Sequence, residues 1–221
     1  MKRLFVVLAV LVTGASPAAA QSQRRTTRPA QDRPGLVVFG VVDFLDVASS
    51  KTFDAVFGTS KAHGAGAGVE VVNLWKHVFV RVQATKVSFT GQRVVIVNGT
   101  VFKLGTAITA NMTPTELGAG WRFESKNMNY RITPYVGASA VFLNYTETSA
   151  FADAGENVSE TFKGFGAFAG VDVRVLRQVF VGAEGQYRVI SSSPAANSAA
   201  ATFGEKNLGG TVLRLKIGVR F

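Results

Sequence analysis

Apolar and polar residues alternate with a period of two along the last eleven residues of the chain. Leu213, Leu215, Ile217, Val219 and Phe221 fall on one parity, and Arg214, Lys216, Gly218 and Arg220 fall on the other. This period places successive side chains on opposite faces of a β-strand, whereas a helix would scatter the charges around its circumference. The pattern predicts an amphipathic strand, but parity alone does not decide whether water or lipid covers the apolar face.

Further segments from Leu36 onward share this β-rich character. They are separated by stretches rich in Gly, Ser and Asn, and none shows a helical period of useful length. The predicted strands are 36–45, 64–74, 77–89, 113–124, 132–146, 162–175, 178–190 and 208–221. Each offers about ten or more residues, which is what a tilted strand needs to cross a bilayer core. The sequence therefore predicts an all-β fold of eight strands.

The predicted connections alternate between long and short. In order they are 46–63, 75–76, 90–112, 125–131, 147–161, 176–177 and 191–207. Up-and-down barrels of the outer membrane have long loops on one side, and short turns with both termini on the other. A Greek-key sandwich has no reason to keep this rhythm. The prediction is an eight-stranded antiparallel up-and-down transmembrane β-barrel with both termini in the periplasm.

Two local signals add to the barrel prediction. Gly68-Val69-Glu70-Val71 recurs as Gly170-Val171-Asp172-Val173, with a fainter copy at 118–123, as in hairpins of one design repeated around a closed sheet. Asn98-Gly99 lies between two apolar runs, which is the strongest short hairpin signal because both residues tolerate positive φ. We therefore expect strands three and four to continue beyond the membrane as a β-ribbon or a cap.

The beginning of the chain predicts export. Residues 1–20 have a basic start, an apolar run too short to span a membrane and an Ala-Ala-Ala end, as in a cleaved secretory signal peptide. Residues 21–35 are polar and basic and predict a disordered periplasmic tether, so the barrel domain is expected over 36–221. The chain has no cysteine, and its net charge of +10 becomes +8 after removal of Lys2 and Arg3 (10 − 2 = 8). In an exported chain this balance favours anionic lipid headgroups over nucleic acid.

Strand parity also predicts the content of the lumen. In lipid a closed sheet carries its apolar parity outward and its polar parity inward. The predicted lumen charge network is Glu70, Arg81, Glu116, Arg122, Asp172, Arg174, Glu184, Arg188, Arg214, Lys216 and Arg220. Unpaired ions there would cost several kcal/mol each, so we expect acid–base pairs, with Glu184 bound to Arg214 or Lys216 on the neighbouring strand. Eight strands just hold their own side chains, although the excess of bases in this set also allows a narrow ion path.

The sequence predicts no catalytic, cofactor or metal site. Its two histidines, His63 in the first long loop and His77 beside a short turn, are expected on opposite sides of the membrane, where they could not share a metal or a triad. A His63–Ser60 pair of the kind that some outer-membrane lipid hydrolases use is a weak alternative, because a loop His beside a loop Ser is common. We therefore expect a protein that is not an enzyme.

The terminal strand resembles the C-terminal strand of bacterial outer-membrane β-barrels, and the chain looks like the OmpA-like, OmpX-like and OmpW-like small barrels. The resemblance implies a signal read by the barrel-assembly machinery, formed by Leu213, Leu215, Ile217, Val219 and Phe221. It also implies contact with outer-membrane lipid and lipopolysaccharide, and a structural or surface-interaction role with an unknown extracellular partner. A small pore for ions or an apolar solute, and a soluble ligand-binding barrel, remain the alternative functions.

Overall fold

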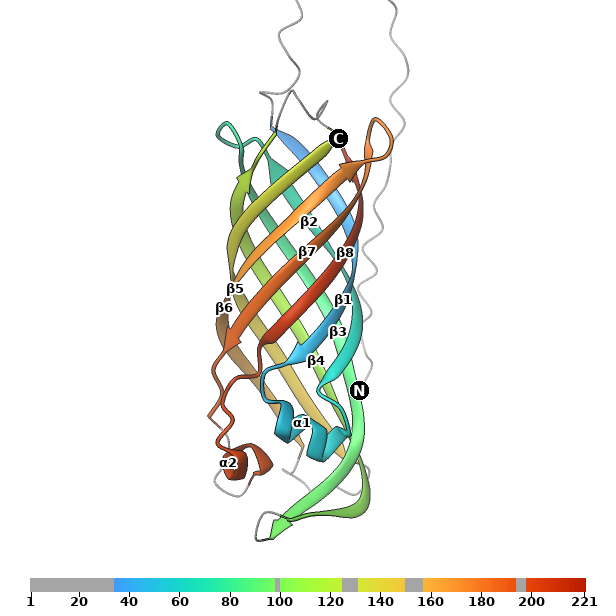
Figure 1. Cartoon of the computed structure of the whole chain (residues 1–221), viewed down its shortest axis with the longest axis vertical. Coiled ribbons are helices and arrows are strands. Elements are labelled where there is room, and N and C mark those ends of the chain that lie inside the picture. Colours follow the sequence, from blue (N-terminus) through green and yellow to red (C-terminus); the bar gives the residue numbers. More distant parts are fainter. Residues whose placement is uncertain (1–33, 98–99, 125–130, 150–156, 194–197) are drawn as a thin grey trace, which may run out of the picture. The chain divides into compact units, whose positions relative to one another are not determined.

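The protein is a closed antiparallel barrel of eight strands (Figure 1). The computed structural model describes residues 34–97, 100–124, 131–149, 157–193 and 198–221. The strands are β1 (Gly35–Val47), β2 (Lys61–Val72), β3 (Val78–Val97), β4 (Thr100–Arg122), β5 (Ile132–Ser149), β6 (Val158–Arg174), β7 (Val179–Ile190) and β8 (Gly210–Arg220). Each strand pairs with the next along the chain, and β8 pairs with β1 to close the sheet. The predicted up-and-down topology is confirmed.

The start of the barrel lies one residue before its predicted position. Gly35 belongs to β1 and pairs with Val72 of β2, so it is not part of a tether. Residues 1–33, which include the predicted signal peptide and most of the predicted tether, lie outside the described residues.

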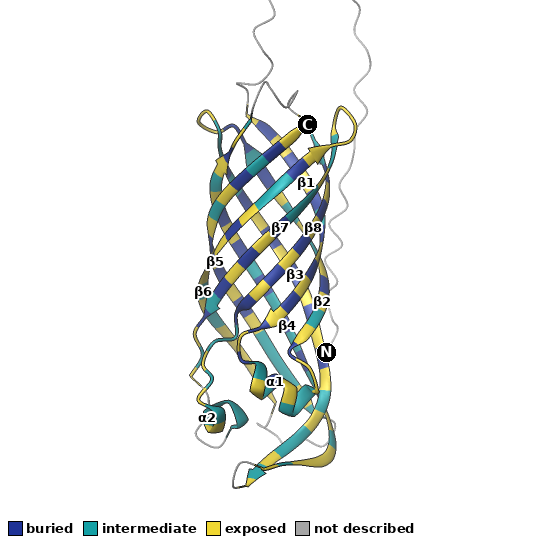
Figure 2. Cartoon of the chain, viewed as in Figure 1, coloured by how far each residue is buried: buried dark blue, intermediate teal, exposed yellow. Residues whose placement is uncertain are grey.

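The strands bury alternate residues, and the polar parity faces inward (Figure 2). On β8, Arg214 and Lys216 are 0% and 4% exposed, whereas Leu215 and Ile217 are 48% and 60% exposed. A barrel that places its apolar side chains outside and its charges inside is built for hydrocarbon around it. The predicted direction of the two faces is therefore confirmed.

Inward-facing glycines let large side chains cross the narrow lumen. A Cβ added at Gly182 of β7 would lie 2.3 Å from Oδ1 of Asp172, and one at Gly118 of β4 would lie 3.2 Å from Cγ of Arg81. The glycines on the polar parity thus provide the space into which charged side chains of neighbouring strands extend.

Strands β3 and β4 extend far beyond the barrel wall as a two-stranded ribbon (Figure 1). Their pairing continues to Val97 and Thr100, whereas β2 pairs with β3 only as far as Val87. The ribbon that Asn98-Gly99 predicted is present, although these two residues lie outside the described ones. The predicted loop 90–112 is wrong for most of its length, because its residues continue the two strands.

Two helices lie in the long connections, which the sequence pattern did not predict. Helix α1 (Ser50–Phe57) follows β1, and α2 (Ala199–Phe203) lies between β7 and β8. Helix α1 ends at Gly58, which adopts φ = 76° and donates its N–H to the Asp54 carbonyl. Neither helix is long and apolar enough to cross a membrane.

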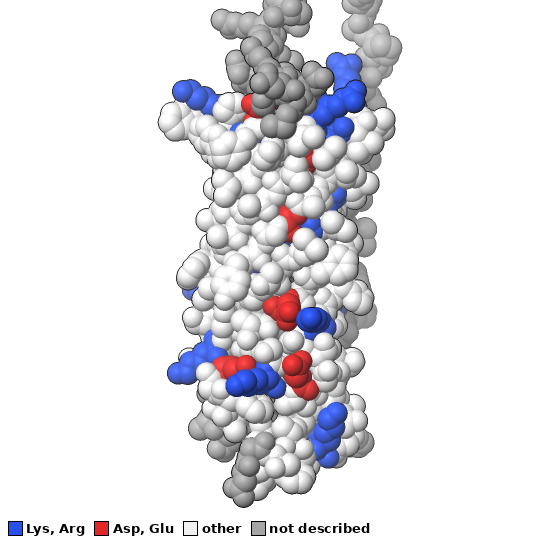
Figure 3. Space-filling model, viewed as in Figure 1, with Lys and Arg blue, Asp and Glu red and all other residues white. Residues whose placement is uncertain are grey.

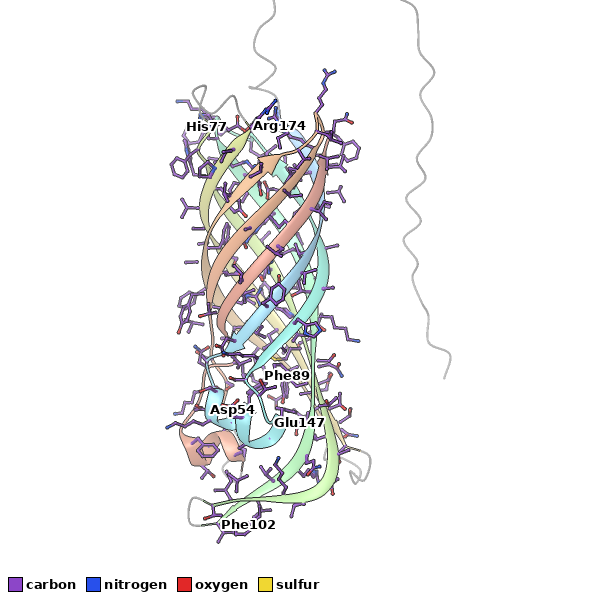
Figure 4. All side chains as sticks on the ribbon, turned by 45° about the vertical axis from the view of Figure 1, so that its right-hand side comes forward. Asp54, His77, Phe89, Phe102, Glu147 and Arg174 are labelled. Carbon is purple, nitrogen blue, oxygen red and sulfur yellow. The ribbon has the colours of Figure 1, made fainter. Side chains whose placement is uncertain are left out.

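Long and short connections lie at opposite ends of the barrel. His77 and Arg174 mark the short-turn end, and Asp54, Phe89 and Glu147 mark the long-loop end (Figure 4). On the face seen in Figure 3, Lys and Arg gather mainly near the two ends, and the wall between them is largely uncharged. On this face, the wall with few charges thus lies between two zones that carry most of the Lys and Arg side chains.

Candidate functional site in the barrel interior

Nine of the eleven side chains predicted for the lumen are buried. They are Glu70, Arg81, Glu116, Arg122, Asp172, Glu184, Arg188, Arg214 and Lys216. Arg174 is exposed because it is the last residue of β6, where the strand reaches the short-turn end, so its placement in the lumen is wrong. Arg220, at the end of β8, is only partly buried and lies 3.7 Å from Glu124 at the same end.

Arg214 is the centre of the middle layer of charges. Its Nε and Nη2 donate to Oδ1 and Oδ2 of Asp43 at 2.7 and 2.8 Å, a bidentate arrangement. Its Nη1 donates to Oε1 of Glu184 at 2.9 Å, which is the contact predicted between β7 and β8. Asp43 and Glu184 stand opposite Arg214 on the two strands that flank β8, so this side chain joins the last strand to the first.

Arg81 neutralises the same Glu184 from the far side of the lumen. Its two terminal nitrogens bond to the two carboxylate oxygens of Glu184, the second at 2.8 Å. Its guanidinium carbon lies 3.7 Å from the centre of the Phe168 ring. A delocalised, weakly hydrated cation suits this combination of carboxylate and aromatic face.

Glu116 and Arg188 complete the middle layer. They form an ion pair, and Glu116 also accepts a hydrogen bond of 2.7 Å from Nε2 of Gln186. Arg188 reaches Asp43 at 3.4 Å, which connects this pair to Arg214. The layer thus contains three acids and three bases in one connected network.

A second layer lies nearer the short turns and is built around Arg122. Its Nη1 donates to Glu70 and its Nη2 to Asp172, both at 2.7 Å. Lys216 lies 2.9 Å from the other oxygen of Asp172 and 4.2 Å from the centre of the Tyr135 ring. Glu70 and Asp172 are the acidic positions of the two repeated segments, so the internal repeat places both carboxylates on one guanidinium.

Sequence reasoning missed Asp43, which balances the buried charge. Strand β1 is apolar on both parities around it, so alternation does not assign Asp43 to a face. With Asp43 included and the two end arginines removed, the buried acids are Asp43, Glu70, Glu116, Asp172 and Glu184. The buried bases are Arg81, Arg122, Arg188, Arg214 and Lys216. The described interior therefore holds five acids and five bases, and the predicted excess of base is wrong.

An apolar cluster closes the lumen at the long-loop end. Its buried members include Leu45, Val87, Phe89, Met112, Val141, Leu143, Ile190 and Val212 of the barrel and Phe53 of α1. Phe53 packs edge-on against Phe89, with 4.9 Å between ring centres. The carboxylate of Glu205, near α2, accepts from the N–H groups of Lys51 and Thr52 and so holds the first turn of α1. Two of the long connections thus position the helix over the end of the barrel.

The middle of the lumen retains a few polar groups without a protein partner. Gln83 and Thr85 are buried on β3, and their side-chain polar atoms have no hydrogen-bond partner among the described residues. Isolated water molecules can satisfy such groups. An ion path, however, needs a continuous column of water through the lumen, and the apolar cluster at the long-loop end interrupts it.

The structure also shows where the candidate catalytic and metal-ligating side chains lie. Among the described residues there is no set of three His, Asp or Glu side chains that could hold a metal ion. His63 is an exposed residue of β2 and not of the loop where it was predicted, and Ser60 is buried and donates to Asp46 at 3.3 Å. His77 lies at the other end of the barrel and stacks edge-on with Trp121, with 5.6 Å between ring centres.

Solved structures of small outer-membrane barrels share this architecture. The major outer membrane protein of Thermus thermophilus has a TM-score of 0.52 and 13% identity, with 85% of this chain and 99% of that chain covered. Ail, the attachment invasion locus protein of Yersinia pestis, solved with the heparin analogue sucrose octasulfate, has a TM-score of 0.51 and 12% identity, with 85% and 98% covered. No protein-family model and no curated protein matches the sequence. The likeness is one of fold, and the chain has the fold of the small outer-membrane β-barrels.

Proposed function

We propose that the protein is an integral barrel of the bacterial outer membrane with a structural or surface-interaction role and a lumen that does not conduct ions. The observation that carries this proposal is the filled interior, in which five acids and five bases are buried against one another below an apolar cluster. Residence in lipid is supported by the exposed apolar belt and the inward polar parity. The role requires no catalysis and no cofactor.

Conductance in planar bilayers tests the closed lumen. Purified, refolded protein should give no steady unitary current under conditions in which a porin added to the same bilayer does. Steady openings from the purified protein would instead favour the pore alternative. Recovery of the folded protein in the aqueous fraction without detergent would favour the soluble alternative.

We also propose that the long loops face the cell exterior and that both termini face the periplasm. Because the chain has no cysteine, single cysteines can report its orientation. Lys51→Cys, at an exposed position of α1, should react with a membrane-impermeant maleimide in intact cells. Arg177→Cys in a short turn should react only after the outer membrane is permeabilised. The reverse pattern would contradict the orientation.

The C-terminal strand is proposed to present the signal for the barrel-assembly machinery. Leu213, Leu215, Ile217 and Phe221 are exposed, so they form one outward apolar row. Phe221→Ala should slow the appearance of the heat-modifiable folded form in the outer membrane. The control is Tyr187→Ala, which removes an exposed aromatic ring from β7. Equal assembly of both variants would count against the signal.

The surface-interaction role is supported by the protruding ribbon of β3 and β4. Val95, Val97, Phe102 and Leu104 are exposed on it beyond the barrel wall, and Phe102 lies toward its far end (Figure 4). Exposed apolar side chains in such a position are typical of contact surfaces. Phe102→Ser/Leu104→Ser should lower the adherence of cells to one another and to a hydrophobic surface. Unchanged adherence at equal surface amounts would argue against this role.

A further inference from the structure

Three basic side chains gather on the outer wall of the barrel at the long-loop border of the apolar belt. Lys61 and His63 of β2 and Lys86 of β3 are exposed, and all three line one hollow of about 670 Å³ on the outer surface. Lys61 and His63 are two residues apart on one strand, so they project from the same face. Lys86 pairs with Ala65, which makes it a diagonal neighbour of His63 at roughly 7–8 Å.

Apolar side chains border this basic group directly. His63 pairs with Phe44 of β1, and Phe44 pairs with Leu213 of β8. Phe44 and Leu213 are exposed and line a second hollow that Lys61 and His63 share. The basic group therefore stands at a boundary where a polar headgroup and its hydrocarbon chain could both find complementary surface.

The outward side chains on the membrane side of the basic group are small. Ala65 and Ala67 of β2 face outward, and Ala67 pairs with Ala84 of β3, which also faces outward. Val42 of β1 pairs with Ala65, and Val82 is the next outward residue of β3 after Ala84; both are larger and exposed. An acyl chain lying along this shallow strip would fill the space that larger side chains occupy elsewhere on the belt.

The positive charge of the basic group is not neutralised by an ion pair with any residue that the structure describes. In this respect Lys61, His63 and Lys86 contrast with the buried lysine and arginines of the lumen. Asp46, which pairs with Lys61 across β1 and β2, is the acidic residue nearest to the group in the strand register. Two lysines beside one carboxylate leave a positive site, and long lysine side chains reach readily toward headgroup phosphates.

We propose that Lys61, His63 and Lys86 bind a phosphate of the glycolipid headgroup of lipopolysaccharide, with an acyl chain lying over Ala65, Ala67 and Ala84. The assignment to this lipid rests on the proposed function, because it requires the long-loop end to face the leaflet that carries the phosphorylated glycolipid. The site would fix the rotation and depth of the barrel relative to that leaflet. It involves none of the residues of the lumen network.

The test compares lipid binding by two variants that lose the same charge. Folded protein in detergent is titrated with bisphosphorylated lipid A, and bound lipid is counted by native mass spectrometry. Lys61→Gln/Lys86→Gln should bind about tenfold or more weakly, because each lysine near a headgroup contributes about 1 kcal/mol. The control, Lys103→Gln/Lys163→Gln, removes two exposed lysines elsewhere and should change binding less than about threefold. Lys61→Arg/Lys86→Arg should keep the binding.

Several results would overturn the site. They are an equal loss of lipid A binding in both paired variants, the same effect of Lys61→Gln/Lys86→Gln when the lipid A has no phosphates, or an equally strong, lysine-dependent binding of phosphatidylglycerol. Each preparation is first checked for heat-modifiable migration. If the paired variant does not fold, Lys86→Gln alone is measured against Lys163→Gln alone. Failure of the wild-type protein to insert into vesicles would contradict the proposed function itself, whereas a folded, inserted barrel without lipid A preference would contradict only this site.

Discussion

Replacing Arg214 by Met removes the cation that binds two buried carboxylates at hydrogen-bond distance and lies 3.3 Å from a third, Glu116. The middle layer then holds three acids and two bases, and Asp43 loses its bidentate partner. Breaking a buried pair in this way costs about 3–5 kcal/mol, because it leaves an uncompensated charge in a low-dielectric interior. We expect a loss of this size in the free energy of unfolding.

The assay is urea unfolding of the barrel in phosphatidylcholine vesicles, followed by tryptophan fluorescence and by heat-modifiable migration. The double variant Arg214→Met/Asp43→Asn restores the balance of the layer to two acids and two bases. It should be more stable than Arg214→Met alone by about 1 kcal/mol or more, within the range of couplings between residues in contact. Arg174→Met, at the exposed end of β6, should change stability by no more than about 0.5 kcal/mol. The reasoning is refuted if Arg214→Met is as stable as the wild type, or if the double variant is no better than the single one.

Three further changes test the packing of the lumen and its apolar seal. Gly182→Ala places a methyl group 2.3 Å from Oδ1 of Asp172 and should lower stability by about 1–3 kcal/mol, whereas Gly185→Ala, with no atom within 4 Å, should be neutral in the same urea titration. Phe53→Ala should cost about 3 kcal/mol or more and speed amide exchange in α1, with exposed Asp54→Ala as the control; equal exchange in both would argue against the seal. Glu205→Ala removes the acceptor for the first turn of α1, so exchange at residues 51 and 52 should rise while that of the β-strands stays unchanged, and a uniform rise would contradict the local role.

The sequence predicts the barrel well because lipid makes the two faces of each strand chemically opposite. Leu215 and Ile217 against Arg214 and Lys216 leave only one arrangement that keeps charges out of hydrocarbon. The same rule says nothing about Asp43, because its neighbours are apolar whether they face lipid or the lumen cluster. Residues of this kind are found only when the partner strand is known.

Other features depend on contacts between distant segments. Pro114 lies in the middle of β4, where its missing N–H would ordinarily argue for the end of a strand. The pairing with β3 skips Thr113 and Pro114, but the register is the same on both sides of them, so the strand continues. Helix α1 is short, and Glu205, far along the chain, holds its first turn. Parity also places Arg174 inward, but the lumen ends before that residue. Local pattern thus predicts the wall of the barrel, whereas its ends depend on tertiary structure.

The bidentate contact between Asp43 and Arg214 joins residues 171 positions apart, on the first and last strands, whose pairing closes the sheet. In a sheet left open between β1 and β8, Asp43 would lack this bidentate partner, which is costly for a carboxylate in a low-dielectric surrounding. Closure of the barrel and neutralisation of Asp43 are therefore coupled, because the same strand pairing places Arg214 beside Asp43.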